Sequence, residues 1–136
     1  MSTKINDESR LSIIERVIQT GATRSDAAKF AGISITTLDR WIKLGETEFE
    51  RTEKDSVDPA PETRPYYDFY IRITKAESQF IVSKLNIIST AASNGDYRAA
   101  ARLLEMRYPE RYGRQVGTGT RDAPFHVVIR NNHDLD

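Results

Sequence analysis

The chain of 136 residues has no cysteine, no net charge and no long apolar run. Without cysteine it can form neither disulfides nor thiolate metal sites, which is compatible with a reducing compartment such as a cytosol. No apolar segment approaches the roughly 20 residues that a membrane-spanning helix needs. The polar first residues, MSTKINDESR, are unlike a secretory signal. Because 20 basic residues balance 20 acidic ones, only the distribution of charge along the chain can indicate a partner.

Residues that carry catalysis or bind metals are also scarce. The two histidines, His126 and His133, do not combine with acidic residues into a set with metal-ligand spacing. The segment GTGT, residues 117–120, lacks the lysine and the length of a phosphate-binding loop. No Ser-His-Asp arrangement and no carboxylate pair stands out. We therefore expect no enzyme, no metal and no cofactor.

Three short helices are expected within residues 1–45, from apolar residues at helical spacing and from capping residues between them. The first ends at Gly21 and the second at Gly32, where a left-handed residue is usual. The third begins after Ser34 and is predicted to end at Gly45. Residues 46–53 could extend it by a solvated turn or two.

The second and third helices have the spacing of a helix-turn-helix. Ala28 is small where the helices touch, Gly32 suits a tight turn, and Leu38 and Trp41 point into the core. Hydroxyls come first on the third helix and cations follow, which suits base edges and then phosphates. The residues expected to contact DNA are Arg24, Lys29, Ser34, Thr36, Thr37, Arg40 and Lys43. The alternative is a three-helix module for protein contacts, since basic residues exceed acidic ones only by seven to five within residues 1–45.

The middle of the chain predicts a linker followed by a helical hairpin. Residues 46–65 contain seven acids, three bases and the segment PAPETRP, a composition typical of an exposed linker. Residues 66–94 form a long helical pattern with two apolar stripes, and a second helix follows Gly95 and ends before Pro109. A doubled stripe suits a helix that is covered from both sides. We expect residues 66–113 to be an oligomerisation domain, with interface residues Phe69, Ile73, Phe80, Ile81, Leu85 and Ile88.

The C-terminal region, residues 114–136, contains one strand-like segment at residues 125–130. Phe125, Val127 and Ile129 alternate with other residues and would share one face. A lone strand needs partners for its backbone, so strands from several subunits could close into a barrel. The alternative is a tail without structure. The predicted fold class is therefore mainly α: an N-terminal helix-turn-helix, a central long-helix hairpin and this short strand.

The segments "TTLDRWI" and "AARLLEMRYPERYGRQV", separated by a long helix, resemble the small terminase subunit of tailed bacteriophages. The resemblance covers nearly the whole chain, with residues 46–65 and the final strand loosely matched. It implies a ring-forming, non-catalytic protein of the infected bacterial cytoplasm that binds double-stranded DNA at the packaging-initiation site. It also implies a large subunit, an ATPase and nuclease, as partner. The residues alone leave open a dimeric helix-turn-helix transcription regulator, the DNA-binding part of a transposase or recombinase, and an interaction adaptor without a DNA role.

Overall fold

The computed structural model describes residues 4–113, and all regular structure in that range is helical. The helices are α1 (Glu8–Gln19), α2 (Arg24–Ala31), α3 (Ile35–Asp55), α4 (Arg64–Ser93), α5 (Tyr97–Arg107) and α6 (Pro109–Tyr112). The chain divides into two compact units, Met1–Val82 and Ser83–Asp136, and α4 contributes to both. The mainly helical prediction is confirmed over this range. The predicted strand with Phe125, Val127 and Ile129 lies outside the described residues.

Local capping defines the first three helices as the sequence predicts. The side chains of Asp7, Thr23 and Ser34 each accept a hydrogen bond from a backbone N–H in the first turn of α1, α2 and α3, at 3.3, 3.1 and 3.1 Å. Gly32 ends α2 with a φ of +79°, a left-handed conformation that suits glycine. Since Ile35 begins α3 only three residues later, the turn of the helix-turn-helix is tight.

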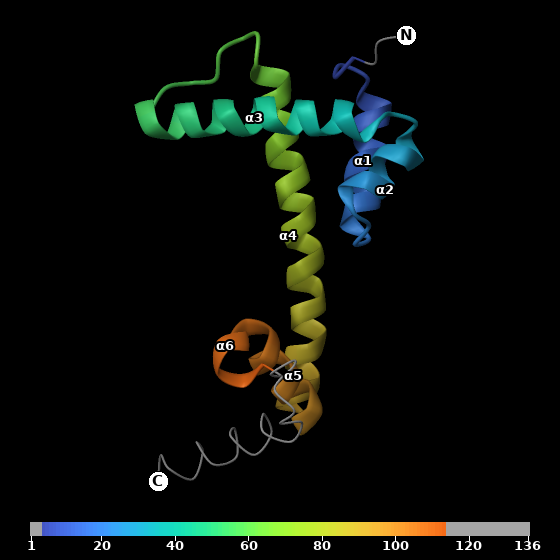
Figure 1. Ribbon diagram of the computed structural model, residues 1–136, viewed down its shortest axis with the longest axis vertical. Coiled ribbons are helices and arrows are strands. Elements are labelled where there is room, and N and C mark those ends of the chain that lie inside the picture. Colours follow the sequence, from blue (N-terminus) through green and yellow to red (C-terminus); the bar gives the residue numbers. More distant parts are fainter. Residues whose placement is uncertain (1–3, 114–136) are drawn as a thin grey trace. The chain divides into compact units, whose positions relative to one another are not determined.

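The hydrophobic core lies in the first unit, and α4 is part of it. In Figure 1, α1 and α2 lie side by side, and α3 lies across the N-terminal part of α4. The rings of Trp41 on α3 and Phe69 on α4 meet edge to face, with centroids 5.9 Å apart. Phe69 and Ile73 are 1% and 0% exposed. The prediction that these two residues form a subunit interface is therefore wrong, because their surface is already buried within the chain.

Gly45 does not end α3, and that prediction is also wrong. The helix continues ten residues further, to Asp55, as the alternative extension allowed. Gly45 is buried where α3 crosses α4, and an added Cβ would clash with the carbonyl oxygen of Tyr66 and lie 2.5 Å from the Cβ of Tyr70. The glycine thus permits two helices to approach closely. Residues 46–55 and 64–65 of the predicted linker are consequently helical, and only residues 56–63 connect α3 to α4.

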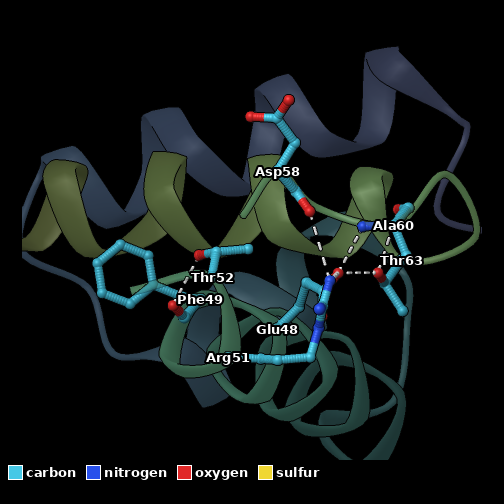
Figure 2. Close-up of polar contacts among 7 residues, drawn as sticks. All are labelled: Glu48, Phe49, Arg51, Thr52, Asp58, Ala60 and Thr63. Carbon is cyan, nitrogen blue, oxygen red and sulfur yellow. Dashed lines mark hydrogen bonds and ion pairs between the residues drawn. The ribbon is translucent and has the colours of Figure 1, made fainter. Parts of the chain in front are cut away.

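A buried carboxylate on α3 holds this connection in place (Figure 2). Glu48 is 5% exposed, although it lies in the stretch predicted to be solvated. It accepts hydrogen bonds from the Ala60 backbone N–H at 2.6 Å and from the Thr63 hydroxyl at 2.7 Å. Arg51 forms a two-pronged ion pair with it, at 2.7 and 2.9 Å, and donates to the Asp58 carbonyl at 3.4 Å. These bonds lower the pKa of Glu48 to about 2, with the Arg51 hydrogen bonds as the largest cause.

The described part of the second unit, residues 83–113, contains helices without buried side chains. Asp96 caps α5 by accepting hydrogen bonds from the backbone N–H groups of Arg98 and Ala99, at 3.0 and 3.2 Å. The predicted turn at Gly95 is confirmed by its φ of +102°, and α5 ends before Pro109 as expected. The short helix α6 then follows. Each of these features depends on neighbouring residues in the sequence.

Candidate nucleic-acid interface

The first half of α3 has one buried face and one exposed face. Leu38, Trp41 and Ile42 are buried, and they anchor the helix on the core. The opposite face carries four exposed side chains that can hydrogen-bond or bear charge, namely Thr36, Asp39, Arg40 and Lys43. In a helix-turn-helix, this is the helix that enters the major groove of DNA. The candidate interface therefore lies on a helix whose opposite face is packed into the hydrophobic core.

Thr36, Arg40 and Lys43 are available for a ligand, as the sequence predicts. All three are exposed, and Arg40 and Lys43 take part in no ion pair with any residue in the 4–113 range. The arrangement places a hydroxyl one turn before the first cation. Lys29, in the last turn of α2, is also exposed. Exposed cations on neighbouring helices can contact successive phosphates.

The Ser34 and Thr37 hydroxyls are engaged with each other and with the helix end. Ser34 Oγ accepts from the Thr37 backbone N–H at 3.1 Å and donates to Thr37 Oγ1 at 2.9 Å. The Ser34 side chain thus satisfies one of the N–H groups that a helix leaves free in its first turn. These two predicted DNA contacts are better explained as a cap than as base-reading groups.

Arg24 is turned toward α4. Its Nε and Nη2 atoms donate to the two carboxylate oxygens of Glu77, at 2.8 and 3.0 Å. These hydrogen bonds raise the pKa of Arg24 further, and the charges of Asp39 and Glu46 add to the effect. The guanidinium therefore lies among acidic groups. A phosphate would have to compete with Glu77 for it.

An arginine of α4, Arg72, connects that helix to α1. Arg72 contacts Glu15 at 2.9 Å and Glu8 at 3.0 Å. Nothing in the sequence pattern pointed to Arg72, Glu77 or Glu48. Arg72 and Glu77 have their partners on other helices, and Glu48 binds Ala60 and Thr63 beyond the end of α3 as well as Arg51 on α3 itself. The charged residues of α4 showed only that the helix is not uniformly apolar. Together the ion pairs of Arg24 and of Arg72 connect α1 and α2 to the first half of α4.

Exposed apolar residues also border the candidate interface. Phe30 on α2 is 74% exposed, and Ile35 and Leu44 on α3 are 38% and 40% exposed. Ile35 is the first residue of α3, next to Thr36, whereas Leu44 follows Lys43 at the other end of the exposed face. Ile35 is not among the residues that the sequence predicts to contact DNA.

Within residues 4–113, His, Cys, Asp and Glu side chains form no group of three or more that could hold a metal ion. In the same range, no helix combines the length and apolarity needed to cross a membrane. The exposed face of α3 is thus the site that the described residues define best.

Comparison with known proteins agrees with the helix-turn-helix. Residues 9–48 match the sequence model of a protein family described as "Helix-turn-helix domain". The match begins in α1 and ends in the middle of α3, so it includes the whole candidate interface. No curated protein and no solved structure matches the chain. The N-terminal part of the chain is a helix-turn-helix DNA-binding domain.

Proposed function

We propose that this chain is the non-catalytic DNA-recognition subunit of a phage genome-packaging motor. It binds the packaging-initiation site on double-stranded DNA and recruits or regulates the large ATPase and nuclease subunit, in the cytoplasm of the infected bacterium. The observation that carries the DNA-binding part is the exposed face of α3, on which Thr36, Arg40 and Lys43 have no competing ion pair within residues 4–113. The packaging role is supported by the resemblance of the segments TTLDRWI and AARLLEMRYPERYGRQV to small terminase subunits.

The apolar surface of α4 supports assembly into a homo-oligomer, in this proposal a ring. Ile81 and Leu85 belong to the predicted interface and remain 54% and 40% exposed. Ile88, one turn further, is half-buried, and so is Phe80, whose ring lies beside Gly21. Surfaces of this kind commonly mark contacts between proteins. In a ring, the segment 125–130 would pair with the same segment of neighbouring subunits.

Removing the two free cations of α3 tests DNA binding. The Arg40→Ala/Lys43→Ala double variant should weaken binding to every duplex, because these cations replace counterions on the phosphate backbone. We expect the slope of log affinity against log salt to flatten by about two units at most. The matched control is Lys54→Ala/Lys75→Ala, which removes two exposed cations outside the interface. Unchanged binding by the first variant, measured by electrophoretic shift at several salt concentrations, contradicts the assignment of this face.

Native mass spectrometry separates packaging from transcription regulation. A packaging subunit should form an assembly larger than a dimer and bind a large terminase subunit in a pull-down with purified proteins. A chain that binds DNA only as a dimer and ignores the large subunit would be a transcription regulator instead. A chain that fails to bind DNA at all would be an interaction adaptor.

A further inference from the structure

The first turn of α3 presents an apolar side chain where a DNA-reading helix approaches the bases. Ile35 is the first residue of α3 and is 38% exposed. The hydroxyls on either side of it along the helix start, those of Ser34 and Thr37, bind each other at 2.9 Å. Ile35 and Thr36 are therefore the exposed side chains of this turn that are not engaged by another residue of the described range, 4–113.

The chemistry of the major groove determines what an isoleucine can read there. The N-terminal residues of a recognition helix contact base edges. Unmodified base pairs present hydrogen-bonding groups in the major groove and one apolar group, the 5-methyl of thymine. An isoleucine has no hydrogen-bonding group in its side chain, so it can discriminate between bases only through that methyl group.

We propose that Ile35 packs against the 5-methyl group of a thymine and makes one position of the DNA site specific for thymine. This inference rests on the proposed DNA-binding role of α3. It assigns specificity at that position to an apolar contact, and it leaves Arg40 and Lys43 as contacts to the backbone. Thr36, beside Ile35, would serve the neighbouring base through its hydroxyl.

The test uses the full chain and a library of duplexes with a random central segment. The wild-type chain selects its preferred sequence, and each thymine of that duplex is then replaced in turn by deoxyuridine, which lacks only the methyl group. We expect one replacement to weaken wild-type binding about fourfold, as expected for one methyl group removed from water. Ile35→Ala should bind the thymine and uracil duplexes equally. Leu44→Ala, which removes a similarly exposed apolar side chain from the same helix, should retain the wild-type preference.

Every other outcome contradicts either the Ile35 contact or the DNA-binding role itself. If no uracil replacement affects the wild-type chain, or if Ile35→Ala keeps the preference, the proposal about Ile35 is overturned. The uracil series uses wild-type protein, so it does not depend on the folding of a variant. Binding of the library without any enriched thymine also overturns the Ile35 contact while leaving the DNA-binding role intact. Failure to bind any duplex at low salt would instead contradict the proposed function.

Discussion

Residues 4–82 and 83–113 are both rich in helix, but every buried side chain in the described range belongs to the first group. In the first unit, helices from distant parts of the sequence share a core that runs from Ile5 to Ala76. In the second, α5 begins and ends on local signals, and large apolar residues stay exposed, with Ile87 at 62%. Isolated helices of about 12 residues are marginal in water, so such a unit needs packing from elsewhere. The contrast indicates that the first unit is stabilised within the chain, and the exposed apolar residues of the described part of the second agree with the proposed contacts between subunits.

The same comparison revises the boundaries of the DNA-binding domain. The helix-turn-helix match ends at residue 48, but Phe69, Ile73 and Ala76 of α4 complete its core. Arg24 and Arg72 add ion pairs between α4 and the first two helices. The domain that folds as one unit is therefore larger than the three helices that the motif requires.

The largest expected effect comes from removing a core side chain contributed by α4. Phe69→Ala should lower the free energy of unfolding by about 3–5 kcal/mol, because it leaves a cavity beside Trp41. The matched control is Phe30→Ala, which removes a ring that is 74% exposed and should change stability by less than about 0.5 kcal/mol. Denaturant unfolding followed by tryptophan fluorescence measures both. If both variants lowered the free energy of unfolding equally, α4 would not be part of the core, and the contrast between the two units would fail.

The second prediction concerns the region that lacks a core. Leu85→Asp should dissociate the proposed oligomer by placing an unpaired charge in the subunit interface. We expect a cost of at least about 3 kcal/mol, or more than about a hundredfold in the dissociation constant. Leu44 is equally exposed, at 40%, so Leu44→Asp is the matched control and should leave the oligomer intact. Sedimentation velocity decides between them, and a wild-type chain that is monomeric at high concentration would contradict the partner hypothesis.

The third prediction concerns the buried carboxylate that holds the connection between α3 and α4. The pKa of Glu48 falls from 4.5 to about 2 in the folded chain, so the unfolded chain binds a proton first as the pH decreases. Its stabilising contribution is complete above pH 4.5 and is lost as the pH falls toward about 2. Glu48→Gln should lack this pH dependence of stability. In the wild type, the unfolded chain should bind at most about one proton more than the folded chain within this pH range. Urea unfolding across this range should show the difference between wild type and variant shrinking with acidity, whereas a constant difference would contradict the assigned pKa.

Features set by neighbouring residues were predictable from the sequence. Ser34 as a cap, Gly32 as a turn and Gly95 with Asp96 as a break between helices each need only a few adjacent residues. The outward face of α3 followed from the same local pattern, because its buried residues recur at helical spacing. For these reasons the helix-turn-helix and the exposed cations Arg40 and Lys43 were foreseen.

Features set by packing between distant residues were not predictable. Gly45 looks like a helix end in sequence, but its role depends on Tyr66, which lies 21 residues away. Glu48 looks solvated until Ala60 and Thr63 are placed beside it. The two apolar stripes of α4 indicated that other residues pack on both faces of the helix. Periodicity does not say whether those residues belong to the same chain or to another subunit. The structure assigns Phe69 and Ile73 to the chain's own core and leaves Ile81 and Leu85 exposed.

The smallest expected effect concerns Arg24, which the sequence placed on DNA and the structure pairs with Glu77. Each partner is more than a third exposed, at 38% and 35%, so solvent screening should limit the stability lost in Glu77→Gln to about 1 kcal/mol or less.

The more informative measurement is the salt dependence of DNA binding. Arg24 begins α2, and the helix before the recognition helix crosses the DNA backbone. Once Glu77 no longer holds it, Arg24 should reach a phosphate, raise affinity and steepen the salt slope by about 0.9. Arg24→Gln alone should leave the slope unchanged, and Arg24→Gln combined with Glu77→Gln should abolish the gain. A slope that flattens by about 0.9 in Arg24→Gln alone would mean that Arg24 already contacts DNA despite Glu77, and that α4 does not restrain the DNA-binding surface.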